Sequence, residues 1–591
     1  MTEKYQAAGY ALLFVKEREI FMKNKKAFTA GIASVISSAV LVSAAAAAYQ
    51  YTLSDAKRLQ ETLAARSALR PEDDINGDGY VNIYDLSILK GQLQADTGEA
   101  AESTVPATAE YVKLQGRNLQ KDGITWLVQS GSAAEFTVTG TSAVLSLAGD
   151  GGIYSEADFR PRYAVYVDGE LILDKTMDAE TETVTLFEGS LSRTAEVKVM
   201  LLSEAMYGGL GISGITAVSS AAVPVKPAAQ NDLCIEFIGD SITCGYGVEG
   251  LNNYETFKTT TENFSKSYAY LTAQQLGADY SAVCYSGHGV VSGYSSGDKN
   301  AEGLVPDYYT LTSKQSDYAV PWDFSVRAND AVVINLGTND INYVSAEFET
   351  RSVEFTEGYL AFLKTIREKN PDAYIICTLG TMDGADLYPL IEEAVSTFRT
   401  QVDDKIMCYA SAVQNGNADG YGSDWHPSEI TQQNSAYVLA DKICQALGME
   451  SSQIGLDMAA DGVYDVSMNT ESGANAAFYV GYDKSFWVNM VEGGDSADDI
   501  EALISGISLK AGGEYRLQFD YTTTVDTEIP VLVRGDEEYF SGRVSAVSDK
   551  LHFEETFTAA QDDAGVEIVF QLGGLDYYNV TLSNVKLVKI G

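Results

Sequence analysis

Residues 234–243 read Cys-Ile-Glu-Phe-Ile-Gly-Asp-Ser-Ile-Thr, an apolar run that ends in Gly-Asp-Ser. The run predicts a buried strand, and the Gly-Asp-Ser that follows predicts a tight turn into a helix. Open α/β folds bind their ligands beyond the carboxyl ends of their parallel strands. We therefore expect Ser241 at such a sheet edge, where its hydroxyl can reach a substrate.

A serine hydroxyl becomes a nucleophile near neutral pH when an imidazole accepts its proton. The chain has three histidines, and His426 stands within Ser-Asp-Trp-His-Pro-Ser at residues 423–428. We predict that Ser241 is the nucleophile and His426 the general base of an ester hydrolase. Two alternatives remain for the group that orients the imidazole. It is either the carboxylate of Asp424 or a backbone carbonyl, which would leave a Ser-His dyad.

Between residues 230 and 448, short apolar runs alternate with helical stretches. The expected strands are 234–238, 280–285, 331–336, 373–379 and 405–410, and the expected helices include 351–367, 388–398 and 428–447. This alternation predicts the α/β class, with a flavodoxin-like, doubly wound parallel sheet. The turns after the first three strands then lie at one edge of the sheet.

Ester hydrolysis also needs donors that stabilise the oxyanion of the tetrahedral intermediate. The backbone N–H of Ser241, at the start of a helix, is one candidate. Gly287 is the second, with Gly289 as its alternative, because glycine lets a backbone N–H approach a substrate closely. Asn339, after the third strand, offers a side-chain amide. None of this chemistry calls for a metal or a cofactor.

The segments that flank the α/β domain alternate apolar and polar residues in short runs, which is typical of β-structure. We expect a jelly-roll β-sandwich of roughly eight strands at 107–229 and a second β-sandwich at 449–591. Residues 97–106 have the composition of a short solvated linker.

The N-terminus is typical of an export signal. Lys23, Lys25 and Lys26 precede an apolar run at 27–42 and an alanine run at 44–48. We expect a signal peptide within residues 1–48, translated from Met22, and a secreted protein. An uncleaved membrane anchor is the alternative.

Residues 74–85 have the spacing of a calcium-binding EF-hand loop. Oxygen ligands stand at positions 1, 3, 5, 9 and 12, and a backbone carbonyl stands at position 7. In chain order the predicted ligands are Asp74, Asn76, Asp78, Tyr80, Asn82 and Asp85. The segment 49–96 resembles a dockerin, a small α-helical module, and the resemblance implies a cohesin partner on a cellulosomal scaffold. Dockerins usually carry two such loops, and this sequence shows one.

The charge of the chain limits the classes of partner that we expect, and its cysteines leave two alternatives for their redox state. The formal net charge is −43, and no basic stripe offsets it, so we expect no nucleic-acid partner and no anionic membrane surface. A neutral polysaccharide is compatible with an acidic surface. The six cysteines all lie in the central region and are either paired, as secretion allows, or buried free thiols.

The four motifs of the α/β domain, taken in order, resemble the SGNH hydrolases, also known as GDSL-like enzymes. The resemblance assigns Ser241, Gly287, Asn339 and His426 to the four family blocks. The family places its orienting acid three residues before the histidine. That position is Ser423 here, whereas Asp424 lies two residues before.

Residues 107–448 are further similar to carbohydrate esterase family 2, which joins a small β-sandwich to an SGNH domain and carries an Asp-Trp-His-Pro element like 424–427. This similarity implies removal of O-acetyl groups from plant polysaccharides such as xylan and glucomannan. Trp425 would stack on a sugar ring, and His288 would line the acetyl pocket or its rim. The alternatives are a lipase, thioesterase or peptidoglycan O-acetyl esterase, and an inactive polysaccharide-binding protein.

The C-terminal region resembles jelly-roll carbohydrate-binding modules. Several of its aromatic residues are either sugar platforms or core residues: Trp487, Tyr539, Phe540, Tyr577 and Tyr578. The third histidine, His552, lies in this region, and we expect no catalytic role for it.

Overall fold

The computed structural model describes residues 59, 81–82, 85–86 and 100–591, except 383, 385, 482, 483, 547 and 548. The expected export signal lies outside the described residues, as do Asp74, Asn76, Asp78 and Tyr80 of the expected calcium loop. Of that loop, the backbone N–H of Asn82 donates to the Asp85 carboxylate at 2.7 Å. None of the described helices combines the length and apolar character needed to cross a membrane.

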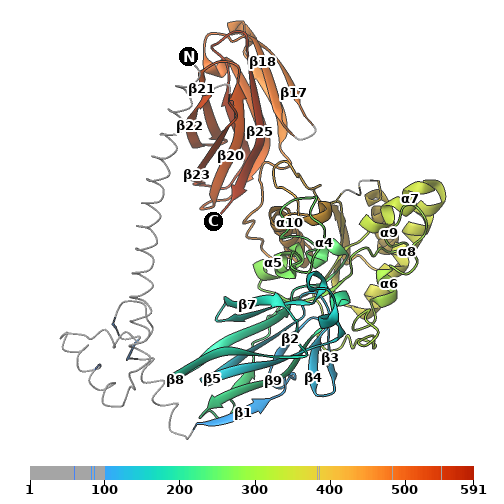
Figure 1. Cartoon of the computed structure of the whole chain (residues 1–591). Coiled ribbons are helices and arrows are strands. Elements are labelled where there is room, and N and C mark those ends of the chain that lie inside the picture. Colours follow the sequence, from blue (N-terminus) through green and yellow to red (C-terminus); the bar gives the residue numbers. More distant parts are fainter. Residues whose placement is uncertain are drawn as a thin grey trace, which may run out of the picture.

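A five-stranded parallel sheet forms the centre of the molecule (Figure 1). Its strand order is β12-β11-β13-β14-β15, and every neighbouring pair is parallel. This is the flavodoxin-like order, so the predicted doubly wound fold is confirmed. The strands are β11 (Cys234–Gly239), β12 (Asp279–Cys284), β13 (Ala331–Asn335), β14 (Tyr374–Leu379) and β15 (Ile406–Ala410). The order reverses at β11, and the turns after β11 and β13 therefore flank the switch point at which such sheets bind ligands.

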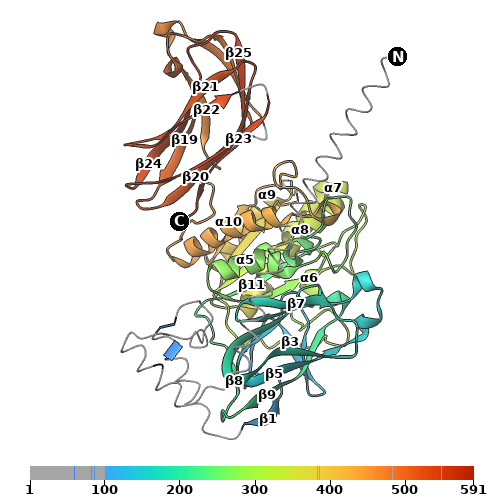
Figure 2. The same cartoon turned by 60° about the vertical axis from the view of Figure 1, so that its left-hand side comes forward.

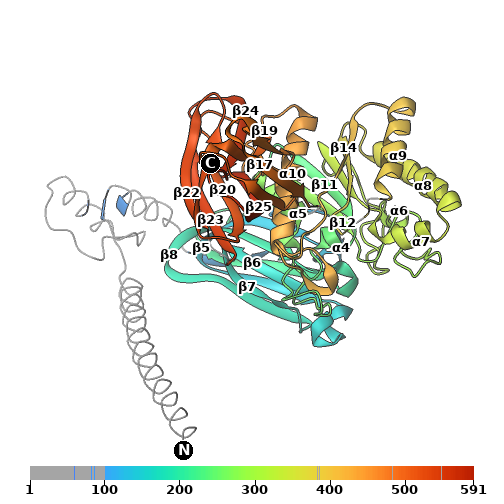
Figure 3. The same ribbon diagram turned by 90° about the horizontal axis from the view of Figure 1, so that it is seen from above.

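Helices cover both faces of this sheet (Figure 3). Helices α5 and α10 pack on one face in a cluster that includes Phe237 and Leu439, and α8 and α9 pack on the other with Ile334 and Phe398. Ser428 caps the start of α10 by accepting a hydrogen bond from the backbone N–H of Thr431. The helices are α4 (Ser241–Cys244), α5 (Tyr268–Gln275), α6 (Val305–Tyr308), α7 (Ile341–Ala346), α8 (Phe348–Lys369), α9 (Tyr388–Gln401) and α10 (Glu429–Leu447).

Strands β1–β10 form the N-terminal β-domain. They are β1 (Ala101–Val105), β2 (Lys113–Gln115), β3 (Asn118–Lys121), β4 (Ile124–Leu127), β5 (Ala133–Gly149), β6 (Arg162–Val167), β7 (Glu170–Thr176), β8 (Thr181–Leu201), β9 (Leu210–Ser219) and β10 (Val225–Pro227). The structure has ten strands where roughly eight were expected, and all ten are joined by antiparallel pairing into one sheet around a shared core. Register shifts in the long strand β5 let it bend and pair with β2, β8, β9 and β10. The expected linker is also corrected, because residues 101–105 pair with β9 along their whole length.

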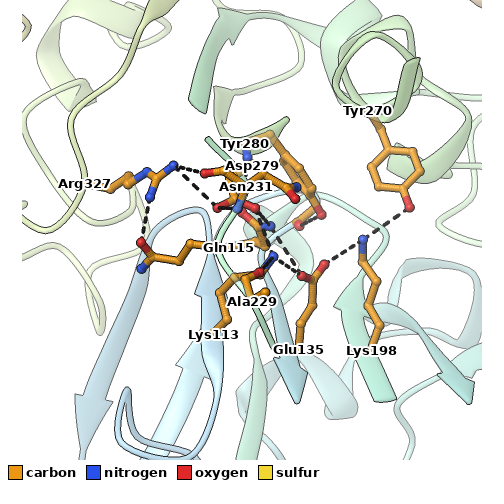
Figure 4. Close-up of polar contacts among 12 residues, drawn as sticks. Lys113, Gln115, Glu135, Lys198, Ala229, Asn231, Tyr270, Asp279, Tyr280 and Arg327 are labelled. Carbon is orange, nitrogen blue, oxygen red and sulfur yellow. Dashed lines mark hydrogen bonds and ion pairs between the residues drawn. The ribbon is translucent and has the colours of Figure 1, made fainter. Parts of the chain in front are cut away.

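Charged side chains join the β-domain to the α/β domain (Figure 4). Lys113 Nζ lies 2.7 Å from a Glu135 carboxylate oxygen and 2.9 Å from Asp279 Oδ1. Lys198 Nζ lies 3.0 Å from the other oxygen of Glu135, and Gln115 Nε2 donates to Asp279 Oδ1 at 2.9 Å. Asp279 belongs to β12, and the other four residues belong to the β-domain. The network therefore connects the β-domain with the edge of the central sheet.

Arg117, between β2 and β3, enters the interior of the α/β domain. Its side chain is fully buried and lies 3.0 Å from the carboxylate of Glu236 on β11. It also donates to the backbone carbonyls of Tyr309 and, at 2.6 Å, Leu311. The two terminal nitrogens of a buried arginine of one domain thus donate to groups of the other domain.

The C-terminal region is a sandwich of two five-stranded antiparallel sheets, as expected for a second β-sandwich (Figure 2). Its strands are β16 (Val463–Met468), β17 (Asn475–Val480), β18 (Phe486–Glu492), β19 (Ile500–Leu509), β20 (Glu514–Thr523), β21 (Thr527–Arg534), β22 (Glu538–Ala546), β23 (Leu551–Thr558), β24 (Asp563–Gln571) and β25 (Tyr578–Lys589). A cavity of about 760 Å³ separates the sandwich from α10. All six cysteines of the chain are free thiols, which decides between the two alternatives left open by the sequence.

Candidate active site

Ser241 is the first residue of α4, directly beyond the carboxyl end of β11. The turn is tight: a Cβ atom on Gly239 would lie 2.0 Å from Thr243 Oγ1, so only glycine is accommodated there. Asp240 caps the helix by accepting a hydrogen bond at 3.0 Å from the Ile242 N–H. The N–H of Ser241, at the first helical position, has no intrahelical acceptor and is available to a ligand.

The structure brings Ser241 and His426 together. Ser241 Oγ lies 2.8 Å from His426 Nε2, although 185 positions separate the two residues. The other ring nitrogen, Nδ1, lies 3.2 Å from the backbone oxygen of Ser423 and 3.1 Å from that of Asp424. Two carbonyl oxygens thus favour the tautomer that carries its proton on Nδ1 and leaves Nε2 free to accept the serine proton.

The carboxylate of Asp424 is not part of this relay, which corrects its assignment as the orienting acid. It accepts hydrogen bonds at 3.0 Å from the Tyr246 hydroxyl and from the Phe257 N–H. The cause is the backbone: Asp424 and Trp425 both adopt left-handed conformations, with φ of 48° and 66°. This local twist presents the Asp424 carbonyl, and not its carboxylate, to His426. The geometry is that of the Ser-His dyad.

The environment of His426 keeps its ring neutral. Burial lowers the pKa of His426 to about 4, and the two backbone hydrogen bonds oppose that shift only in part. The phenol ring of Tyr246 lies against the imidazole, with ring centroids 4.0 Å apart. A neutral imidazole is the form that can act as a general base.

The two further oxyanion candidates differ in their surroundings. Gly287, after β12, has a φ of +74°, which favours glycine, and no described group accepts a hydrogen bond from its N–H. Asn339, after β13, uses its side-chain nitrogen to donate to the His288 carbonyl at 2.9 Å and to Asp240 Oδ2 at 3.2 Å. Gly287 therefore has a free donor, whereas both N–H groups of the Asn339 amide are engaged.

Two buried carboxyl groups support the strand-end turns, and the sequence analysis assigned no role to either. Asp340 accepts hydrogen bonds from the N–H groups of Val290, Val291 and Ser292 and so fixes the loop after Gly287. Burial raises the pKa of Asp340 to about 6 and that of Asp240 to about 7. The sequence feature that could have identified Asp340 is its position in Gly-Thr-Asn-Asp at residues 337–340, directly after Asn339.

The two residues expected to contact substrate lie in opposite environments. Trp425 is 51% exposed and makes edge contacts with Tyr254 and Tyr421, so its indole is accessible beside the dyad. His288 is 5% exposed, and its ring nitrogens contact the Ser286 carbonyl and Lys314 Nζ. The ring of His288 is buried within the loop and does not lie at an exposed rim, and its place in the acetyl pocket stays a prediction.

One group of described side chains has metal-ligand spacing: Glu204, Cys244 of α4 and Glu262, all three buried. Both oxygens of Glu204 already accept hydrogen bonds from Ser286, and Glu262 accepts one from the Glu204 N–H. Three of the four carboxyl oxygens of this group therefore accept hydrogen bonds from protein donors.

Comparison with known proteins links this geometry to esterases. Residues 237–433 match the GDSL-like Lipase/Acylhydrolase family. The chain is 34% identical over 325 residues to the cellulase/esterase CelE of Acetivibrio thermocellus. The aligned stretch covers 54% of this chain and 37% of that protein. The chain is 24% identical over 345 residues to an acetylxylan esterase/glucomannan deacetylase of Cellvibrio japonicus, covering 58% of this chain and 91% of that protein. The chain thus spans little more than a third of the first of these relatives.

Solved structures of esterases share the fold of this chain. A family two carbohydrate esterase from Clostridium thermocellum, determined as an active-site mutant, is 29% identical with a TM-score of 0.50, over 58% of this chain and all of that chain. An acetyl xylan esterase from Butyrivibrio proteoclasticus shares the fold at 22% identity, with a TM-score of 0.53 over 59% of this chain and 99% of that chain. The α/β domain with its β-domain therefore has the fold of these esterases, and its relatives include carbohydrate esterases.

Proposed function

We propose that this chain removes O-acetyl groups from plant cell-wall polysaccharides such as acetylated xylan or glucomannan. The observation that carries the proposal is the 2.8 Å contact between Ser241 Oγ and His426 Nε2 at the carboxyl edge of the sheet. The names of the relatives, acetylxylan esterase, glucomannan deacetylase and cellulase/esterase, support a polysaccharide ester as the substrate.

The proposed reaction is acyl transfer in two steps. Ser241 Oγ attacks the acetyl carbonyl carbon while His426 Nε2 takes the serine proton, which forms a tetrahedral oxyanion. The N–H groups of Ser241 and Gly287 donate to this oxyanion, and Asn339 joins them when its amide exchanges the Asp240 contact for substrate. The bond from carbon to the sugar oxygen then breaks, and His426 returns the proton to that oxygen. Water, activated by His426, releases acetate and restores Ser241.

The exposed indole of Trp425 gives the site a place for a sugar ring. Trp425 lies between Asp424, whose carbonyl contacts His426, and His426 itself. A sugar ring stacked on the Trp425 indole would therefore lie next to the acetyl group that is cleaved. Tyr254 and Tyr421 support the indole from its edges, at centroid distances of 6.0 and 5.3 Å. An aromatic face with accessible area is a suitable partner for the apolar face of a pyranose.

The C-terminal sandwich is proposed to bind the same polysaccharide. Tyr479 and Trp487 pair across β17 and β18, are both more than half exposed, and line a groove of about 520 Å³. Of the five aromatics singled out in the sequence, Tyr578 is buried in the core, and Tyr539 and Phe540 pack against it. Only Trp487 and Tyr577 remain accessible, and Tyr577 lies outside the groove.

The remaining expectations concern residues that the structure does not describe. We propose that the chain is exported, that residues 74–85 bind one Ca²⁺, and that residues 49–96 dock to a cohesin. Calorimetric titration of the full chain with Ca²⁺ tests the second point. We expect one binding event that disappears in Asp78→Ala, and heat unchanged by that substitution would contradict the loop assignment.

The esterase proposal is tested with purified full-length protein and its Ser241→Ala variant. We expect acetate release from acetylated xylan or glucomannan, little turnover of long-chain acyl esters and O-acetylated peptidoglycan, and a loss of at least about 10³-fold in the variant. Faster cleavage of a long-chain ester or of peptidoglycan would favour those alternatives. Equal rates in both proteins would remove Ser241 from the mechanism, and an inactive wild type that still binds polysaccharide would establish the binding-protein alternative.

A second variant separates the dyad from a triad. Asp424→Asn leaves both backbone carbonyls in place, so we expect kcat to stay within about tenfold of wild type. Loss of a true orienting acid costs about 10⁴-fold. A fall of that size would show that the carboxylate takes part after all, and His426→Ala serves as the inactive control.

A further inference from the structure

The β-domain supplies a buried carboxylate that contacts the oxyanion loop of the α/β domain. Glu204 follows β8 and is fully buried. One carboxylate oxygen accepts a hydrogen bond at 2.8 Å from the backbone N–H of Ser286, and the other accepts one from the Ser286 hydroxyl. Ser286 directly precedes Gly287, so Glu204 holds the residue that carries the oxyanion peptide.

The direction of the Gly287 N–H follows from the carbonyl of the same peptide. A trans peptide is planar, so its N–H points opposite to its C=O. The carbonyl oxygen of Ser286 lies 2.9 Å from His288 Nδ1. Because that oxygen is held on the His288 side, the Gly287 N–H is held on the other side, where no described group accepts it.

Lys314 selects the tautomer of His288 that this contact requires. Its Nζ lies 2.6 Å from His288 Nε2 and, as a donor only, uses that nitrogen as an acceptor. His288 therefore carries its proton on Nδ1 and donates it to the Ser286 carbonyl. Burial lowers the pKa of His288 to about 4, which keeps the ring neutral with one donor and one acceptor.

Glu262 holds Glu204 in place. A Glu262 carboxyl oxygen accepts a hydrogen bond at 2.9 Å from the Glu204 backbone N–H. Burial raises the pKa of both carboxyl groups, and the nearby Glu204 carboxylate raises that of Glu262 further, to well above its usual range, so Glu262 is the neutral member of the pair. Glu204 then remains the carboxylate that accepts both donors of Ser286. A glutamine at position 262 would preserve this arrangement.

We propose that Glu204 and His288 are positioning residues: Glu204 holds Ser286 through its N–H and hydroxyl, and His288 holds the carbonyl of the Ser286–Gly287 peptide, so that the Gly287 N–H forms a prearranged oxyanion donor. Glu204 comes from the β-domain, which makes this domain a part of the catalytic apparatus. The inference rests on the proposed function, since it concerns the same acyl transfer. The inference adds that the orientation of the Gly287 N–H depends on Glu204 and His288, two residues that are not among the four family residues.

The test measures kcat and KM of the full chain on a small chromogenic acetyl ester, which makes few contacts beyond the dyad. Glu204→Ala removes both acceptors of Ser286, and we expect kcat to fall about 10²–10³-fold with KM within about threefold, as for loss of one oxyanion donor. Glu204→Gln keeps one acceptor oxygen and should lose less. Glu262→Gln, which keeps the oxygen that accepts from the Glu204 N–H, should lose less activity than Glu204→Ala.

His288 provides an independent pair of variants. The side-chain nitrogen of an asparagine can occupy the position of Nδ1, so His288→Asn should retain most activity. His288→Leu, which lacks the donor, should lose kcat as Glu204→Ala does. A trifluoromethyl ketone, whose adduct with Ser241 carries an oxyanion, should bind more weakly to each impaired variant by about the factor lost in kcat, whereas a merely structural defect would not give this proportion.

The outcomes separate this inference from the esterase proposal. If wild type cleaves the ester, Ser241→Ala does not, and folded Glu204→Gln and His288→Leu are both fully active, the positioning role is wrong and the esterase stands. If Glu204→Ala does not fold, Glu204→Gln and the His288 pair decide the question alone. If wild type does not cleave the ester, the esterase proposal itself has failed. Binding of the trifluoromethyl ketone to wild type, compared with the Glu204 and His288 variants, then shows whether the Gly287 N–H is a prearranged donor.

Discussion

Two β-rich regions flank the α/β domain, and they are attached to it differently. At the N-terminal junction, Arg117 is fully buried against Glu236, and Ala133, Ala164, Met200 and Leu202 of the β-domain belong to one apolar cluster with Ile235 and Phe237 of β11. At the C-terminal junction, Lys586 lies 3.9 Å from Asp419 with its side chain 31% exposed. The described core of the C-terminal sandwich draws its residues from 459–587 alone.

The difference separates a part of the catalytic unit from an appended module. A shared core and buried ion pairs make the β-domain and the α/β domain cooperative, because neither can expose that surface without a large cost. The C-terminal sandwich has its own core and meets α10 across a cavity of about 760 Å³. Changes in the first junction should therefore affect stability and catalysis together, whereas changes in the second should affect neither.

The largest effect is expected from breaking the buried junction. Arg117→Met removes one partner of a buried ion pair and leaves Glu236 with the Tyr309 hydroxyl, which donates to it at 2.8 Å. We expect the free energy of unfolding to fall by about 3–5 kcal/mol. The measurement is the urea midpoint of the full chain, followed by loss of esterase activity.

The matched control lies at the other junction. Lys586→Met also removes a cation from an interdomain ion pair, but one that is partly exposed, and we expect a change within about 0.5 kcal/mol. Similar shifts in the two variants would contradict the distinction between the two junctions.

The second prediction concerns acidic pH. Because burial lowers the pKa of His426 to about 4, the imidazole stays neutral at pH 5 and becomes protonated only below about pH 4. We expect kcat/KM for a small acetyl ester to be flat from pH 7 to about 5 and to fall about tenfold per unit below pH 4.

The polysaccharide binding proposed for the C-terminal sandwich provides a contrast in pH dependence. Its groove is lined by aromatic, aliphatic, amide and hydroxyl side chains, so binding should not change over the same pH range. An acid limb of kcat/KM near pH 6.5, the usual value for histidine, would show that the imidazole is less enclosed than the structure indicates.

The smallest effect is expected in the C-terminal groove. Trp487→Ala removes the largest of the three exposed aromatic side chains that line the groove, and we expect affinity for xylan or glucomannan to fall about fivefold with esterase activity on a small ester unchanged. Tyr577→Ala is the control, since Tyr577 is as accessible but lies outside the groove. Equal losses in both variants would point to a general surface effect and against this groove.

The parts of the fold that follow from local pattern could be predicted from the sequence. The strand that ends in Gly239 and the order of the parallel sheet depend on apolar runs and on turn residues within a few positions of each other. The proximity of Ser241 and His426 then follows from the rule that strand ends share one edge.

The remainder depends on conformations and contacts that no local pattern encodes. Asp424 was a reasonable candidate by spacing, and it was excluded by two left-handed residues that turn its carboxylate toward Tyr246. Residues 101–105 have the composition of a linker and became a strand because β9 offered an unpaired edge. Arg117 and Glu204 are single charged residues in β-rich sequence, and their roles depend on groups far along the chain.

The partners of Arg117 also impose an order on folding. The carbonyl of Leu311 lies 194 positions downstream, so at 5–20 residues per second the ribosome needs roughly 10–40 s to deliver it after Arg117 has been made. During that interval the nascent β-domain has a surface whose apolar and charged groups are still unmatched. Completion of this junction is therefore a late event in biosynthesis, and the nascent β-domain needs protection, as by a chaperone, until the central sheet has been made.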